Sequence, residues 1–233
     1  MHVFAPFSLT HLVTVLVCAA VGAVLTVLGV RWRGTERGTL LHRAWAWAVT
    51  LVQAFNLIFW LTPPRLDPAD SLPLHICDIA GIVAAVSMWT DARWARAVMV
   101  YWGIGLSTQG FIFPVIRDGP DTVRFHIFFL SHLTIVATAV YDTVARGFRL
   151  GWRDLRTITL ILAGWTLVVL PIDIAMRWNY GYIGDVAGKN PAVMLGPWPL
   201  RLLWMFLLAE GAFALLTWGS SRLPKPAGIP DTE

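Results

Sequence analysis

The feature that most constrains this chain is a series of long apolar runs that extends almost from end to end. A run of about 20 apolar residues, at about 1.5 Å rise per residue, matches a bilayer core about 30 Å thick. Backbone groups inside a bilayer must satisfy their own hydrogen bonds, so each run is predicted to form a helix. The sequence contains seven such runs, at residues 9–30, 44–62, 72–90, 97–116, 125–145, 157–176 and 198–218.

Composition supports an all-α, polytopic membrane protein. Hydrophobic residues make up 57% of the chain and charged residues only 14%, whereas a soluble domain is about 25% charged. These values exclude a disordered chain and an ordinary soluble enzyme. No internal repeat or second domain is visible, so residues 1–233 are predicted to form a single integral membrane domain. The net charge of +4 does not indicate a nucleic-acid partner, because the basic residues lie in short loops between apolar runs.

The distribution of basic residues predicts the orientation of the bundle. Cytoplasmic loops carry an excess of Lys and Arg. The second, fourth and sixth loops together hold five: Arg65, Arg117, Arg124, Arg177 and Lys189. The first, third and fifth loops and the tail hold twelve: Arg31, Arg33, Arg37, Arg43, Arg93, Arg96, Arg146, Arg149, Arg153, Arg156, Arg222 and Lys225. We therefore expect the N-terminus outside, the C-terminus in the cytoplasm and an odd number of spans, in a bacterial inner (cytoplasmic) membrane.

The two cysteines predict neither a disulfide framework nor a metal site. Cys18 and Cys77 both lie within apolar stretches and have no CxxC or zinc-ligand spacing. Cys18 is interpreted as a small apolar filler. No metal and no cofactor are predicted.

Polar side chains within the spans form a second pattern. Such groups are costly in a bilayer and usually face the interior of a bundle, so each is a lead to a functional site. With the N-terminus outside, Cys77 lies roughly 7.5 Å along the third span and His132 roughly 10 Å along the fifth. The long sixth loop, residues 177–197, is expected to fold over the outer mouth of the bundle. Polar residues at similar depth are candidates for binding substrate or stabilising an oxyanion: His75, Asp78, Thr108, Gln109, Asn179 and Tyr180.

Cys77 and His132 have the chemistry for covalent catalysis. A thiol reacts as the thiolate, which the amide dipoles of an early helical position stabilise. Pro73 suits a first helical turn and predicts a helix start close to it. An imidazole from another helix can take the thiol proton, and His132 is preferred to His75 because residues two apart on a helix do not face each other. Asp78 is expected to orient a histidine or to pair with an arginine.

Four segments resemble the YwaF-like integral membrane family. They are LPLHICDIA at 72–80, YWGIGLSTQGFIFP at 101–114, FLSH at 129–132 and NYGYIGD…NPAVMLGPWP within 179–199. Animal relatives of this family include transmembrane protein one-six-four, described as a cysteine-centred acyltransferase that moves fatty acyl chains onto ether lysophospholipids. The resemblance implies an acyl-accepting role for Cys77 and a catalytic role for His132. The shared polar positions that it matches are Gln109, Asn179 and the turn Gly196–Pro199.

The sequence departs from the family pattern in the sixth loop. After the Asn-Tyr pair the family commonly has a short Met/Leu segment followed by Lys-Pro. This chain instead has Gly181, Tyr182 and Ile183, and later Lys189-Asn190-Pro191. The departure leaves the substrate open even where the chemistry is carried over.

Three functions follow from these patterns. The leading hypothesis is a membrane-embedded acyltransferase, transacylase or lipid hydrolase that acts on phospholipid or lysophospholipid near the outer leaflet. Its partners would be membrane lipids. The alternative is a small-solute transporter or substrate-binding membrane module that uses the same polar pocket. A third hypothesis is a haem- or quinone-binding protein that uses His75 and His132. A retinal pump is set aside because the last span has no lysine, and the oligomeric state stays open.

Overall fold

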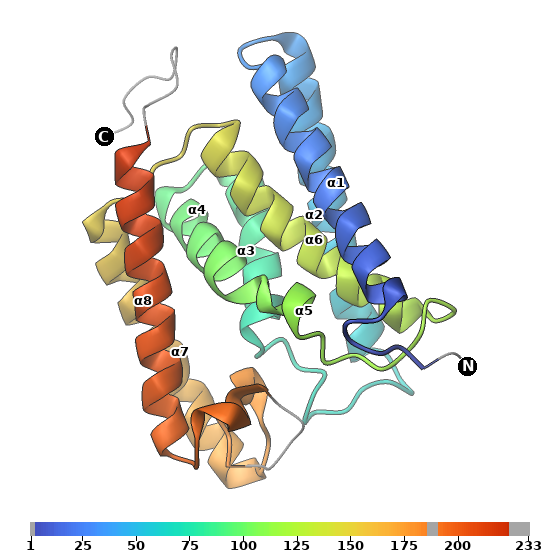
Figure 1. The fold of residues 1–233 in the computed structure, drawn as a ribbon, viewed down its shortest axis with the longest axis vertical. Helices are drawn as coiled ribbons and strands as arrows, with labels where there is room; N and C mark the ends of the chain where they lie inside the picture. Colours follow the sequence, from blue (N-terminus) through green and yellow to red (C-terminus); the bar gives the residue numbers. More distant parts are fainter. Residues whose placement is uncertain (1–2, 186–190, 224–233) are drawn as a thin grey trace.

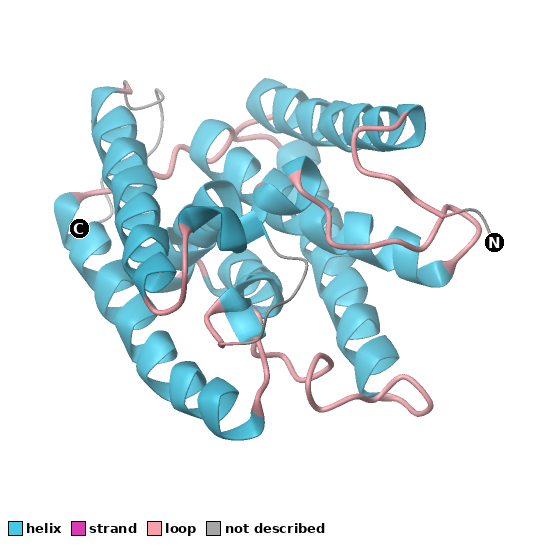
Figure 2. Cartoon of the chain, turned by 60° about the horizontal axis from the view of Figure 1, so that its bottom comes forward, coloured by secondary structure: helices cyan, strands magenta, loops and turns pink. Residues whose placement is uncertain are grey.

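Each apolar run predicted from the sequence contains helix in the computed structural model, which describes residues 3–185 and 191–223. Within these ranges the chain forms helices and no strand, with one isolated antiparallel bridge between Val3 and Asp118 (Figure 2). The longer helices are α1 Leu9–Arg31, α2 Glu36–Leu61, α3 Ile76–Thr90, α6 Val123–Val144, α7 Trp152–Met176 and α8 Leu200–Arg222. Shorter segments are α4 Arg93–Val100, η1 Tyr101–Ser107, α5 Gln109–Ile112, η2 Tyr180–Tyr182 and η3 Pro191–Leu195.

Five of the described helices, α1, α2, α6, α7 and α8, are long and apolar enough to cross a membrane. Their outward faces carry many exposed Leu, Val, Ile, Phe and Trp side chains, which is costly in water and favourable in lipid. α6 is the most buried of the five and packs against α1, α2, α3, α4 and η1. The chain is an integral, multi-pass membrane protein built around α6. In Figure 1, α1 begins at the lower end of the bundle and α8 ends at the upper end.

The third predicted span begins later than expected. Helix α3 starts at Ile76, with His75 as its N-cap, so it has only 15 residues and Pro73 precedes it. The residue before a proline is disfavoured in the α region, and here the Leu72 N–H donates to the Tyr180 hydroxyl at 3.0 Å. The prediction of a helix over 72–75 is therefore wrong. The later start places Cys77 at the second position of the helix.

The fourth predicted span, residues 97–116, is not one regular helix. It divides into α4, a π-helical segment η1 and the short α5, which ends at Ile112. Residues 113–116 leave the helix because Phe113 precedes Pro114 and has a non-helical backbone, with φ −127° and ψ 65°. π-Helical segments within α-helices are frequent at functional sites. η1 packs against α3, α4, α6 and α8.

A network of ion pairs fastens the upper end of the bundle in Figure 1, where α4 begins and α6 ends. Arg96 makes two contacts of 2.9 Å with the Asp142 carboxylate, which also accepts from Arg146 at 3.0 Å. Arg93 pairs with Asp154 at 2.6 Å. The side chain of Asp142 is only 1% exposed, so its two arginines satisfy a charge that is costly to bury alone. Basic residues of the third and fifth loops thus also hold helix ends together.

Close packing between α1 and α6 gives a stability prediction. A Cβ on Gly29 would overlap the Tyr141 ring and the Ala145 Cβ, whereas a Cβ on Gly22 would meet the Ala137 Cβ at an ordinary 3.5 Å. Overpacking of this kind costs about 1–3 kcal/mol. Gly29→Ala is expected to lower the melting temperature of the detergent-solubilised protein. Gly22→Ala, the control on the same helix, is expected to preserve it. Equal melting temperatures for the two variants would contradict this packing.

Candidate functional site

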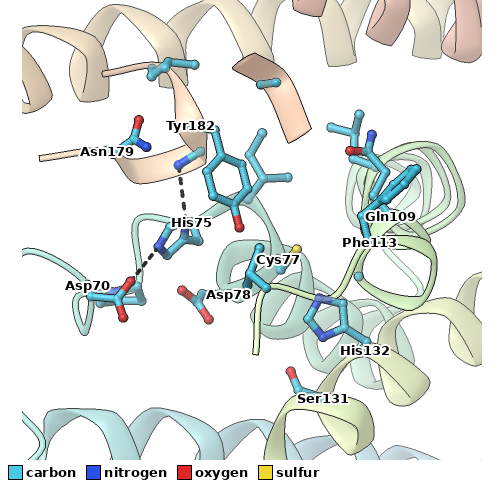
Figure 3. A pocket seen from close by; sticks show the side chains of 18 of the residues that line it. Asp70, His75, Cys77, Asp78, Gln109, Phe113, Ser131, His132, Asn179 and Tyr182 are labelled. Atoms are coloured by element: carbon cyan, nitrogen blue, oxygen red, sulfur yellow. Dashed lines mark hydrogen bonds and ion pairs between the residues drawn. The ribbon is translucent and has the colours of Figure 1, made fainter. Parts of the chain in front are cut away.

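A cavity of about 1090 Å³ opens at the lower end of the bundle. Residues of α2, α3, η1, α5, α6, α7 and α8 line it, together with loop residues before α3, between α5 and α6, and after α7. The walls from α7 and α8 are mostly apolar, while the start of α3 and the facing turn of α6 bring polar groups (Figure 3). A large apolar space with a few converging polar groups is typical of a ligand site.

Cys77 lies in the first turn of α3, where backbone N–H groups have no acceptor within the helix. Its own N–H interacts with its sulfur, and the Ser107 hydroxyl at the end of η1 also interacts with the thiol. Ser107 Oγ is buried and makes no hydrogen bond of standard geometry within the described residues. Cys77 is a free thiol that lines the cavity. The Ser107 hydroxyl and the Cys77 N–H are thus the groups of the described chain that interact with this sulfur.

His132 lies on α6 and is fixed in one tautomer. Its Nδ1 is 2.8 Å from the Phe128 carbonyl oxygen, an acceptor only, so Nδ1 carries the proton and Nε2 has a free lone pair. The rings of Phe128 and Phe111 pack against the imidazole, with centroid separations of 4.4 and 6.1 Å. On the remaining side, Gly110 lies so close that a Cβ there would overlap Nε2 and Cδ2. His132 is thus held with its basic nitrogen available to the cavity.

Cys77 and His132 approach the same cavity from α3 and α6 (Figure 3). No hydrogen bond joins them in the part of the chain that the structure describes. In enzymes such pairs often close to hydrogen-bond distance only with substrate bound. The structure therefore brings the two predicted residues to one site without joining them directly.

His75 has a different environment from His132, because both of its ring nitrogens have partners. Nδ1 accepts from the Gly181 N–H at 3.3 Å, and Nε2 lies 3.5 Å from Asp70 Oδ1. The hydrogen bond from His75 holds the pKa of the Asp70 carboxyl below its usual value. Although His75 lines the cavity, these contacts make it a bridge between the start of α3 and the η2 turn.

Tyr180 completes this bridge and was predicted to bind substrate. It is fully buried, does not line the cavity, and its hydroxyl accepts from Leu72 N at 3.0 Å and donates to Pro68 O at 2.7 Å. The indole N–H of Trp165 on α7 donates to Leu74 O at 3.0 Å. The Tyr180 hydroxyl is therefore engaged with the backbone before α3, and a role of Tyr180 in substrate binding stays a prediction.

Comparison with known proteins now adds to this geometry. A model of the TMEM164 family matches residues 6–217. The chain belongs to the TMEM164 family. This agrees with the resemblance to YwaF-like proteins carried by residues 72–199. No curated protein and no solved structure gives a match.

The other predicted site residues of this TMEM164-family chain differ in whether they line the cavity. Gln109 at the start of α5 and Asp78 on α3 line the cavity, and Asp78 interacts with Asn56 of α2. Asn179 also lines it, but its Oδ1 accepts from Gly184 N at 3.1 Å and thereby shapes the η2 turn. Thr108 is outside the cavity lining, since its hydroxyl donates back to Ile104 O at 2.8 Å. A substrate contact by Thr108 stays a prediction, and the cavity lining does not include this residue.

One cavity residue of this TMEM164-family chain was missed by the sequence reasoning. Tyr182 lines the cavity next to Gly181, and in the sequence it stands out only as part of the departure from the family pattern. Its backbone φ of 65° is rare for a bulky residue, and such strained conformations cluster at functional sites. No sequence signal identified this conformation, because the flanking residues carry no turn motif that requires it. Among the described residues there is no group of three or more His, Cys, Asp or Glu side chains suited to hold a metal ion.

Proposed function

We propose that the chain is a membrane-embedded lipid acyltransferase, with hydrolysis of the acyl-enzyme as its side reaction, in which Cys77 is the nucleophile and His132 the general base. The observation that carries this proposal is that Cys77, in a first helical turn, and the lone pair of His132 Nε2 serve the same large apolar cavity. Membership of the TMEM164 family supports it. The substrates would be phospholipid and lysophospholipid.

The reaction follows from the available groups. His132 Nε2 takes the thiol proton, and the Cys77 sulfur forms a bond to an ester carbonyl carbon while the carbonyl electron pair moves to oxygen. When this tetrahedral adduct collapses, the ester C–O bond breaks and the departing lysolipid oxygen takes the proton from His132. The acyl thioester then passes its chain to the hydroxyl of a second lysolipid, or to water, by the same steps in reverse.

The shape of the cavity suits a lipid chain. Its walls beyond Cys77 include Leu162 on α7 and Met205, Phe206 and Ala209 on α8. Phe206 is 39% exposed, so this wall continues to the lipid-facing surface of the bundle. An acyl chain bound there would bury apolar surface, which is favourable by roughly 25 cal/mol per Å².

The proposed topology places this site near the outer leaflet. It counts α3 and the α4–η1–α5 segment as spans in addition to the five long helices, which gives seven crossings with the N-terminus outside. The start of α1 and the end of α8 lie at opposite ends of the bundle (Figure 1), which supports an odd number of spans. The basic upper end would then face the cytoplasm, in a bacterial inner membrane.

Trapping the acyl-enzyme tests the proposed function. Purified protein incubated with phospholipid that carries a labelled acyl chain is expected to acquire covalent label that neutral hydroxylamine removes, as it does for a thioester. Peptide mapping is expected to place the label on Cys77. Cys18→Ala is the matched control, since Cys18 lies on α1 outside this cavity, and it should label as the unaltered chain does.

Label that persists in Cys77→Ala would contradict the mechanism. A small-solute transporter, the alternative, predicts no covalent label and a ligand-dependent rise in melting temperature that survives Cys77→Ser. Haem ligation by His75 has less support, since both its nitrogens already have protein partners.

A further inference from the structure

The η2 turn that carries Tyr182 is fixed to the segment before α3 at several points. The Tyr180 hydroxyl holds the backbone of Pro68 and Leu72, and the Gly181 N–H donates to His75 Nδ1 at 3.3 Å. These contacts join two loops that are more than 100 residues apart in sequence. Because His75 directly precedes the first turn of α3, the position of Tyr182 is tied to that of Cys77.

Gly181 fits against α7 in a way that sets the direction of the next residue. With φ of 58°, it is in the left-handed region, and a Cβ there would overlap the Trp165 indole. The indole is itself anchored by its bond to Leu74 O. Tyr182 follows with φ of 65°, a conformation that a tyrosine holds only where its surroundings enforce it. The contacts of Gly181 with Trp165 and with His75 therefore fix the direction of the Tyr182 side chain.

The Tyr182 side chain points into the cavity. Figure 3 shows its hydroxyl directed toward the space between His75 and Cys77. Its ring lies 6.0 Å from the His75 ring, between centroids. Within the described residues the hydroxyl makes no hydrogen bond, in contrast to the two made by Tyr180. Tyr182 thus presents an uncommitted hydroxyl beside the thiol.

The environment keeps this hydroxyl protonated. Burial raises the pKa of Tyr182 above its usual value, and negative charge on the neighbouring Cys77, Asp70 and Asp78 side chains, when they are ionised, raises it further. A neutral phenol is a hydrogen-bond donor. It can stabilise negative charge that develops on a nearby oxygen without giving up its proton.

We propose that Tyr182 is a catalytic residue whose hydroxyl donates a hydrogen bond to the oxyanion formed when Cys77 attacks the ester. This inference rests on the proposed function. The phenol keeps its O–H bond throughout, since the proton of Cys77 passes to His132 and then to the departing lysolipid oxygen. Donors that are in place before charge develops give the largest stabilisation, because they require no reorganisation.

Tyr182→Phe tests the proposal, because it removes only the hydroxyl and keeps the ring. It is expected to lower kcat for acyl transfer by about 10²–10³-fold, the loss typical of one oxyanion donor, with KM nearly unchanged. Formation of the acyl thioester on Cys77 should slow by the same factor. The melting temperature should stay unchanged, whereas Tyr180→Phe, the matched control, should lower it by removing two hydrogen bonds to the backbone.

The outcomes separate this inference from the proposed function. If Cys77→Ala abolishes transfer but Tyr182→Phe keeps at least half of kcat, Tyr182 is not the donor while the cysteine mechanism stands. A raised KM with unchanged kcat would equally overturn the donor role, because it indicates binding of the ground state. If Cys77→Ala retains transfer, the proposed function itself fails.

Discussion

Replacing Cys77 with alanine is expected to lower the acyl-transfer rate by at least about a thousandfold, as for loss of a nucleophile in other covalent enzymes. The reason is that Cys77 is the one thiol among the described residues that line the cavity. Ser131 also lines it, but its hydroxyl donates to Gln53 Oε1 at 3.2 Å and belongs to the contact between α2 and α6. The measurement is release and transfer of a labelled acyl chain by purified protein in detergent or vesicles.

Cys77→Ser is the companion variant for this prediction. It keeps the approximate size of the side chain and its ability to donate a hydrogen bond, so its melting temperature should stay close to that of the unaltered chain while its activity stays low. A hydroxyl is a far weaker nucleophile than a thiolate at neutral pH. Full activity in either variant would show that the polar cavity acts by another route.

The helices could be predicted well from sequence, because apolar runs of bilayer length have few alternatives. Their ends were less predictable. Pro73 is a common first-turn residue, yet it also restricts Leu72, whose N–H bonds to the distant Tyr180 hydroxyl, and the helix begins only at Ile76. The fourth apolar run is continuous in sequence, but its π-helical segment depends on packing against four neighbouring helices. Local sequence carries no signal for that packing.

The site was only partly predictable for a related reason. Cys77 and His132 were recognisable because reactive polar groups are rare in membrane spans. Whether a neighbouring polar group is free depends on contacts made far away in sequence, as the partners of His75 and Tyr180 demonstrate. The same holds for Arg201, a charged residue within the last apolar run, whose guanidinium donates to Gly184 O.

His132→Asn is expected to lower the acyl-transfer rate by about 10²–10⁴-fold, the usual contribution of a general base. A buried histidine is often a simple strut between structural elements, and the bond from Nδ1 to Phe128 O could be such a strut. Asparagine places an amide N–H near the position of Nδ1, so it can keep that bond while removing the base at Nε2. The comparison variant is His132→Gln, whose longer side chain places its amide near the position of Nε2 and loses the bond to Phe128 O.

The two variants therefore separate catalysis from support. If His132 acts as the base, both variants are inactive, and His132→Asn is the more stable to heat because Phe128 O retains its donor. If His132 is only a strut, His132→Asn regains activity along with stability. Recovery of most activity in His132→Asn would show that His132 is not the general base. It would also remove the catalytic reason for a residue without Cβ at Gly110, beside the imidazole.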